Sequence, residues 1–203
     1  MSLKNLDSES ASKIRSSVKS KYRDIAMRPK GHFPYPVGRE SALKLGYDQA
    51  WLEAVPSDVV EKFVGAGNPF SIRMPKPGER ILDAGCGCGL DAFVCSLLVG
   101  PSGRVSAVDL TAEMLVLPRM LVSKLEQQNV EFREASIEAL PYEDGAFDLV
   151  ISNGVLNLIP DKKAAFSELA RVLRTDGVLA AADLLVMEEI PPEVLESKDA
   201  WST

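Results

Sequence analysis

From residue 80 onward the chain alternates short apolar runs, rich in branched residues, with longer stretches whose apolar residues recur at helical spacing. The runs predict buried strands, and the longer stretches predict amphipathic helices. Their regular alternation predicts a parallel sheet with right-handed crossovers and helices on both faces. The predicted strands are Arg80–Ala84, Arg104–Asp109, Val130–Arg133, Phe147–Ser152 and Val178–Ala182. The predicted helices are Leu90–Val99, Ala112–Gln127 and Lys162–Leu173.

Pro118 conflicts with the helix expected over Ala112–Gln127. A proline inside a helix removes a hydrogen bond and costs about 3 kcal/mol. We therefore expect a kink near Val116–Leu117, or a helix that restarts at Pro118.

The N-terminal part of the chain has a different pattern. Residues 1–12 are polar and serine-rich, which predicts a frayed start, and the proline-rich segment 32–38 predicts a loop. Two short helices are expected at Tyr47–Val55 and Ser57–Val64. Between the start and the loop, helical spacing of apolar residues predicts a helix carrying Ile14, Val18, Tyr22 and Ile25. We expect one structural domain, with residues 1–75 as a helical arm and cap and residues 76–203 as the core.

The stretch Ile81–Asp91 carries the strongest chemical signal. Branched apolar residues lead into Asp83 and then into glycines at alternate positions, which is typical of a strand that turns sharply into a helix. Glycine lets a ligand lie against the main chain, and the amides at the helix start are donors. The spacing G-x-G-x-G differs from the G-x-G-x-x-G of dinucleotide folds, which disfavours a nicotinamide-dependent dehydrogenase. Asp83 precedes the turn, where a carboxylate can receive an ammonium group.

A second acid, Asp109, ends the next predicted strand. A carboxylate at that position can accept hydrogen bonds from both hydroxyls of a ribose, each contributing roughly 1.5–3 kcal/mol. The turn and Asp109 together indicate an adenosine-type cofactor with a cationic amino-acid end.

With these motifs the chain resembles the class I S-adenosylmethionine-dependent methyltransferases. The resemblance implies a doubly wound, mostly parallel, Rossmann-like α/β fold and S-adenosylmethionine as cofactor. It covers about residues 60 to 186 and is carried by Ile81–Asp91, Val105–Thr111, Glu134–Pro141 and Phe147–Asn153. Within this class the chain is similar to the arsenite methyltransferase-like branch, also described as UbiE or type 11-like. That similarity is carried by Gly65–Phe70, Ile151–Leu158 and Pro160–Lys162.

The resemblance also implies which residues bind the cofactor. Leu110 and Met114 are expected beside the adenine, although Met114 is equally suited to helix core. Ser136 and Ile137 match the adenine edge, where the family often has an acid, so the contact should be weaker or made by backbone. Gly89 is suited to helix packing as well as to cofactor contact. The full set is Asp83, Gly85, Cys86, Gly87, Gly89, Asp109, Leu110, Met114, Ser136, Ile137 and Asn153.

Other residues have two interpretations each. Glu138 is expected either to orient the loop that contains Ser136 or to be a surface carboxylate. Asn153, at the end of the fourth strand, is expected near the methionine portion of the cofactor. The aromatic residues Tyr22, Phe33 and Tyr35 are candidates for lining the acceptor pocket, or they simply pack the N-terminal segment against the sheet.

The acceptor is less defined. In arsenite methyltransferases cysteine thiolates hold the arsenic, and the resemblance places Ala66 and Gly154 at two of those positions, with a third beyond Thr203. Neither residue is a ligand for a soft metalloid. No catalytic residue is assigned, because in-line positioning can suffice for methyl transfer to an ionised nucleophile. The expected function is methyl transfer to an unidentified small molecule; the alternatives are an arsenite methyltransferase and a non-catalytic S-adenosylmethionine-binding protein.

Composition narrows the partners and the compartment. A net charge of −6 and a pI near 5.0 argue against nucleic acid. The odd number of cysteines and the single histidine disfavour a disulfide framework or a metal site. With no apolar run of ~18 residues and no signal core, we expect a cytoplasmic protein without a membrane partner. A cluster of basic residues near the N-terminus predicts a solvated helix face or a binding face: Lys13, Arg15, Lys19, Lys21, Arg23, Arg28 and Lys30.

The last segment is short for the implied family, which usually adds two more strands after the fifth. Only Met187 to Thr203 follow the predicted core. We expect a short or truncated C-terminus: either the chain given stops before its natural terminus, or another chain covers the exposed sheet edge, as in a homodimer.

Overall fold

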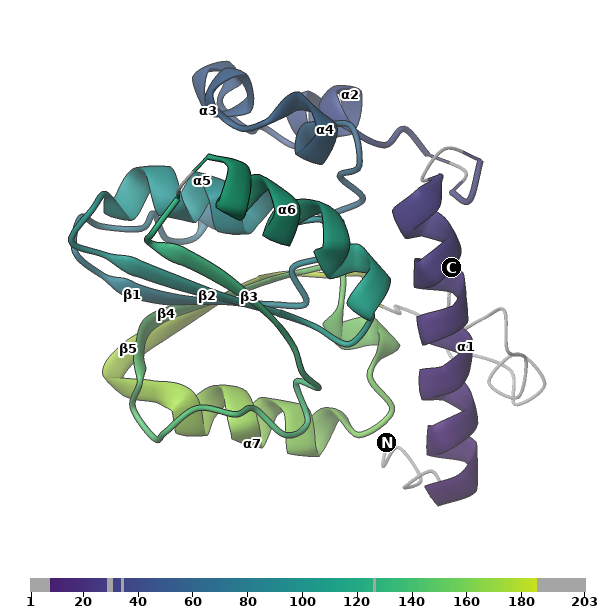
Figure 1. Cartoon of the computed structure of the whole chain (residues 1–203). Helices are drawn as coiled ribbons and strands as arrows, with labels where there is room; N and C mark the ends of the chain where they lie inside the picture. The colour runs from purple at the N-terminus through teal and green to yellow at the C-terminus, as the bar shows by residue number, and fades with distance from the viewer. Residues whose placement is uncertain (1–7, 29–30, 34, 126, 186–203) are drawn as a thin grey trace.

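The computed structural model describes residues 8–28, 31–33, 35–125 and 127–185. Within these residues, five strands form one sheet in the order β3-β2-β1-β4-β5, and every neighbouring pair is parallel (Figure 1). The strands are β1 (Arg80–Ala84), β2 (Arg104–Asp109), β3 (Val130–Glu134), β4 (Phe147–Asn153) and β5 (Leu173–Ala182). The sequence prediction of a doubly wound parallel sheet is confirmed.

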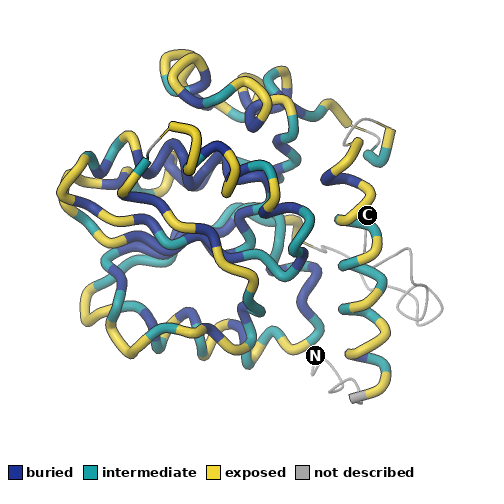
Figure 2. The backbone as a smooth tube through the Cα atoms, in the orientation of Figure 1, coloured by how far each residue is buried: buried dark blue, intermediate teal, exposed yellow. Residues whose placement is uncertain are grey.

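Helices cover both faces of the sheet. α5 (Leu90–Val99) and α6 (Val116–Lys124) lie on one face, and α7 (Lys162–Val172) lies on the other (Figure 1). Each face has its own apolar cluster, and the burial pattern follows the layers, with the sheet interior dark in Figure 2. Parallel strands that are covered on both faces need near-continuous apolar runs, which explains why β1 and β4 could be predicted from the sequence.

The N-terminal segment contributes four helices to the described part of the chain. α1 (Ser8–Met27) runs across the edge of the sheet, whereas α2 (Arg39–Lys44), α3 (Gln49–Ala54) and α4 (Ser57–Val60) pack beyond α5 (Figure 1). α2 was not predicted, although its Glu40 and Lys44 form an ion pair at helical spacing. α3 and α4 are shorter than predicted; α3 begins after Asp48, whose carboxylate caps the Ala50 amide.

The region around Pro118 differs from both expectations. A 3-10 helix, η2 (Ala112–Leu115), comes first, and α6 begins at Val116. The helix therefore restarts two residues before Pro118, which falls within the first turn of α6. N–H groups in a first turn have no intrahelical partner, so proline costs little there.

β5 is longer than predicted because the chain enters the sheet directly from α7. Leu173 pairs with Phe147, and pairing resumes at Val178 opposite Leu149. The residues between them bulge out, with Asp176 at a φ of 63°. The sequence therefore showed only the second half of the strand.

Two further short helices complete the described chain. They are η1 (Pro69–Ser71) and η3 (Leu156–Leu158). Residues 8–12 were expected to be frayed, but they belong to α1. The predictions for the first seven residues and for Met187–Thr203 lie outside the described residues. In the part that is described, no helix is both long and apolar enough to cross a membrane.

Candidate functional site

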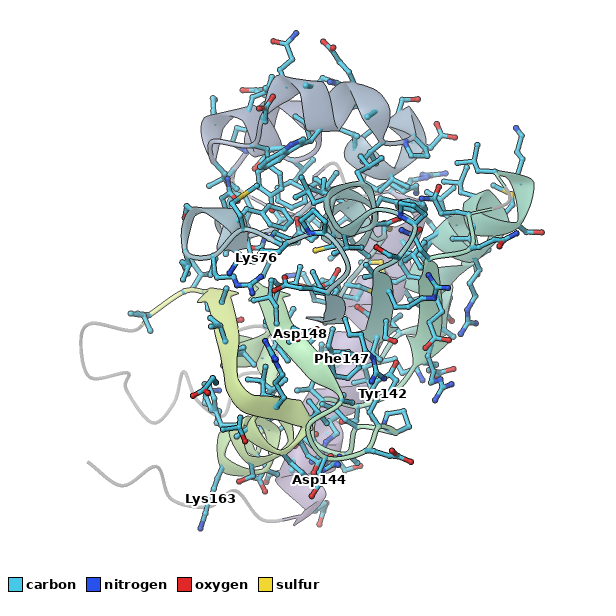
Figure 3. The ribbon with its side chains drawn as sticks, turned by 90° about the vertical axis from the view of Figure 1, so that its left-hand side faces the viewer. Lys76, Tyr142, Asp144, Phe147, Asp148 and Lys163 are labelled. Carbon is cyan, nitrogen blue, oxygen red and sulfur yellow. The ribbon has the colours of Figure 1, made fainter. Side chains whose placement is uncertain are left out.

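A pocket opens at the carboxyl edge of the sheet. The Gly-rich turn between β1 and α5, the ends of β2 and β4, and the loop after β3 line it, and α1 contributes Arg15, Val18 and Tyr22. The opposite edge of the sheet, where Phe147 and Asp148 begin β4, faces the viewer in Figure 3. All of the predicted cofactor residues line this one pocket: Asp83, Gly85, Cys86, Gly87, Gly89, Asp109, Leu110, Met114, Ser136, Ile137 and Asn153.

Asp83 is the second-last residue of β1 and is only 1% exposed. Its Oδ2 atom has no hydrogen-bond partner, and no ion pair reaches this carboxylate from any residue described. Burial, followed by the nearby charges of Asp91 and Asp109, raises the pKa of Asp83 well above its usual value. An unpaired buried carboxylate is costly, so its position on the pocket wall favours a ligand that brings a cationic donor.

Asp109 joins the two turns that border the pocket. Its Oδ2 accepts a hydrogen bond from the Gly87 amide at 2.9 Å, and its Oδ1 accepts one from the Thr111 amide at 2.8 Å. Burial raises the pKa of Asp109, although these two amides oppose the rise. The Thr111 hydroxyl also donates to this carboxylate. A carboxylate has about four acceptor sites, so the predicted contact with a ribose is compatible with these bonds.

The glycines of the turn have different surroundings. A Cβ atom built at Gly87 would meet nothing closer than Met114 Cε at 3.8 Å, so the backbone there is open to the pocket. A Cβ at Gly89 would lie 2.8 Å from the Phe132 ring. The packing role of Gly89, left open by the sequence, is therefore present, while Gly87 leaves room for a ligand against the main chain.

The loop after β3 is organised by Glu138. Its carboxylate receives two hydrogen bonds from Arg15, at 2.8 and 2.7 Å, and one from the Ser136 hydroxyl at 3.3 Å. Burial alone would raise the pKa of Glu138, but the bonds from Arg15 lower it. Of the two interpretations of Glu138, the structure supports the one in which it orients the loop.

A row of basic residues on α1 docks the helix onto the pocket rim. The pairs are Arg15–Glu138 at 2.7 Å, Lys19–Glu134 at 2.9 Å and Arg23–Glu113 at 2.7 Å. The basic residues are four positions apart, so they share one helix face. These residues were predicted to lie on a solvated or ligand-binding face; in the structure each of these three pairs with an acid of the core, while its side chain stays 37–55% exposed.

This docking predicts a specific effect on local opening. Arg15→Met should speed amide hydrogen exchange in α1 about fivefold, corresponding to ~1 kcal/mol for a two-bonded, partly exposed pair. Lys13→Met is the matched control, since Lys13 pairs with Glu9 inside α1 and not with the core. Equal exchange rates in the two variants would show that apolar contacts alone hold α1.

Aromatic and apolar groups complete the cover. Ile25 of α1 packs in one cluster with Cys88 and Met114, and Tyr22 and Phe33 pack against that cluster. Tyr22 also lines the pocket, whereas Tyr35 is 41% exposed and stacks on Phe33 with centroids 5.1 Å apart. Met114 therefore belongs to both the core and the pocket wall.

Asn153 is held by protein groups on both sides of its amide. Its Oδ1 accepts from the Ala66 and Gly67 amides at 2.8 and 3.0 Å. Its Nδ2 donates to the Tyr47 hydroxyl and the Asp91 carboxylate, each at 3.0 Å, and to the Gly67 carbonyl at 2.9 Å. Neither Tyr47 nor Asp91 had a predicted role; the acid at the start of an apolar helix was the one signal available in the sequence.

The cysteines are buried thiols. Burial raises the pKa of Cys86 and of Cys95 well above the usual value and that of Cys88 to about 11. At neutral pH all three are protonated, and thiolate is the form that attacks or ligates. They do not replace the thiols absent from Ala66 and Gly154, which lie side by side: a Cβ built at Gly154 would be 3.3 Å from Ala66 Cβ.

Comparison with known proteins identifies the family. A family model described as a methyltransferase domain matches residues 75–203. The chain belongs to this methyltransferase domain family. An arsenite methyltransferase from Halobacterium salinarum is 40% identical over 157 residues, which cover 77% of this chain and 40% of that protein. A ubiquinone/menaquinone biosynthesis C-methyltransferase from Hahella chejuensis is 40% identical over 129 residues, covering 63% of this chain and 51% of that protein.

A solved structure is similar over most of this chain. The arsenic (III) S-adenosylmethionine methyltransferase from Chlamydomonas reinhardtii has a TM-score of 0.63 and 41% identity, covering 72% of this chain and 51% of that one. This chain spans about two fifths to half of the length of these relatives. S-adenosylmethionine is the cofactor that the family and this structure imply.

The residues present fit that cofactor. The unpartnered Asp83 oxygen suits the ammonium of its methionyl end, and the open backbone at Gly87 leaves space beside it. Asp109, Leu110 and Ile137 offer a carboxylate and apolar surface on the same wall. A nucleoside with a cationic tail matches this donor set.

Proposed function

We propose that this chain binds S-adenosylmethionine in the pocket at the carboxyl edge of the sheet and methylates a small-molecule acceptor. The observation that carries the proposal is the buried, unpaired Asp83 oxygen beside the open Gly87 backbone, in a chain of the methyltransferase domain family. When bound, the cofactor supplies an electrophilic methyl group on a sulfonium.

The residues of the pocket divide the binding between them. Asp83 receives the ammonium, and Asp109 receives the ribose hydroxyls. Ser136 and Ile137 contact the adenine edge on a loop that Glu138 and Arg15 hold in place. α1 covers the pocket and keeps water away from the reacting atoms.

A small organic acceptor is supported better than arsenite. The relatives include proteins named for arsenite and two named for quinones. Ala66 and Gly154 lie next to each other and carry no thiol, while the nearby pocket wall includes the apolar side chains of Phe63, Val64 and Val155. This wall suits a carbon or heteroatom acceptor in an apolar molecule, for which positioning supplies most of the rate.

Calorimetric titration of the purified chain with S-adenosylhomocysteine tests the proposal. We expect a dissociation constant in the micromolar range, about −8 kcal/mol, and no competition by a nicotinamide dinucleotide. Absence of binding would refute the proposal. Binding without methyl transfer to any member of a panel of quinols, phenols, thiols and arsenite would favour the non-catalytic alternative.

A further inference from the structure

A buried polar network lies directly behind the pocket wall. The Tyr47 hydroxyl lies 2.5 Å from Asp91 Oδ1, and Asn153 Nδ2 lies 3.0 Å from Asp91 Oδ2. Tyr47 is 3% exposed and Asp91 is 6% exposed. The network joins the segment between α2 and α3, the first turn of α5 and the end of β4.

Asp91 and Asp83 place two carboxylates at one end of the pocket. Both line it, and within the described residues neither forms an ion pair. Asp91 is satisfied only by neutral donors, while Asp83 Oδ2 has none. Two buried acids without a cation make this end of the pocket complementary to a positive charge.

We propose that Tyr47 is a positioning residue, whose hydroxyl, together with Asn153, fixes Asp91 as a second carboxylate beside Asp83 for the positively charged end of the cofactor. This inference rests on the proposed function, because the ligand is S-adenosylmethionine or its product. It adds to that function an acid on α5 and a tyrosine distant in sequence from the Gly-rich turn.

Tyr47 is suited to a clean test because its ring and its hydroxyl have separate roles. The ring packs edge-on against Phe63 and Phe70, with centroids 5.2 and 5.8 Å away. Tyr47→Phe therefore keeps the packing and removes the hydroxyl, which donates to Asp91 and accepts from Asn153. Loss of a donor to a carboxylate disfavours its charged form.

The direction of the pH effect follows from the groups around Asp91. Burial raises the pKa of Asp91 to about 6, and the bonds from Tyr47 and Asn153 oppose the rise. Asp83 and Cys95 also face Asp91, and their ionisation would raise its pKa further. Without the Tyr47 hydroxyl, the midpoint should move up by about one pH unit.

The experiment is titration of the full chain with S-adenosylhomocysteine between pH 5.5 and 8.5. Wild-type affinity should fall as the pH drops through about 6, where Asp91 becomes protonated. Asp83 is present in every variant, so any effect of its titration is common to all of them. In Tyr47→Phe the midpoint should be about one unit higher, giving roughly fivefold weaker binding at pH 6 and equal binding at pH 8.5. Tyr142→Phe, on the α7 side of the sheet and outside the pocket (Figure 3), should leave the profile unchanged.

The outcomes separate the two proposals. No binding by the wild-type chain would overturn the proposed function and this inference with it. Wild-type binding with an unmoved midpoint in Tyr47→Phe, whatever its melting temperature, would overturn the role of Tyr47 alone. If Tyr47→Phe does not fold, Asp91→Asn provides the same test: its affinity should be low and lack the step near pH 6, and a wild-type profile would contradict the inference.

Discussion

Asp109→Asn should weaken binding of S-adenosylhomocysteine at least tenfold. In the wild-type chain the carboxylate already holds the Gly87 and Thr111 amides, so the ribose hydroxyls would add to an acceptor that is fixed on both sides. The substitution removes the charge and turns one acceptor into a donor, which faces an N–H group. Loss of one hydrogen bond to a charged acceptor, about 1.5 kcal/mol or more, corresponds to a factor of ten or greater.

Calorimetry of the variant at pH 7.5, together with its melting temperature, measures this effect. Asp144→Asn is the matched control, because it makes the same chemical change at a carboxylate that is 81% exposed and does not line the pocket. A variant that melts like the wild type and binds with wild-type affinity would show that Asp109 only shapes the turn. If both the affinity and the melting temperature fall, titration at a temperature well below the lower melting point separates loss of binding from loss of folding.

Most of the sheet and the pocket floor were predictable because their determinants are local. β1 and β2 are short apolar runs with Asp83 and Asp109 at or next to their carboxyl ends, and the Gly-rich turn directly follows β1. Parallel strands bring such ends to one edge, so the fold itself assembles the predicted residues. The sequence did not fix the start of α6. Proline is tolerated throughout the first turn of a helix as well as at its first residue, so Pro118 does not show at which of these positions the helix begins.

The parts that escaped prediction depend on partners far apart in the chain. Arg15 and Glu138 are separated by 123 positions, and Tyr47 and Asp91 by 44. A basic row on a helix has the same pattern whether water or acids face it. The sequence around a tyrosine between two short helices likewise does not indicate which carboxylate it will contact. Only the tertiary structure therefore reveals the role of the basic row on α1 and that of Tyr47.

The second large expected effect is a gain of arsenite binding. Ala66→Cys combined with Gly154→Cys should create an arsenite site, because the two Cβ atoms would be about 3.3 Å apart and both thiols could reach one arsenic atom. As(III) is soft and prefers thiolate ligands. Two ligands on one rigid site should bind roughly 10²–10⁴-fold more tightly than either single variant, because the second bond forms within the complex.

The measurement is a titration with arsenite of the wild type, both single variants and the double variant. Gly154 has a φ of 71°, and its Cβ would lie 3.2 Å from the Ala66 amide nitrogen, so the single Gly154→Cys variant also reports the structural cost, about 1–2 kcal/mol. The native cysteines should stay silent in every variant, because burial keeps them protonated. Wild-type binding as tight as that of the double variant would refute the assignment of these two positions and make arsenite the acceptor to pursue. Binding by the double variant alone would mean that the fold can hold an arsenic site and that the two missing thiols are the reason why the wild-type chain does not bind arsenite.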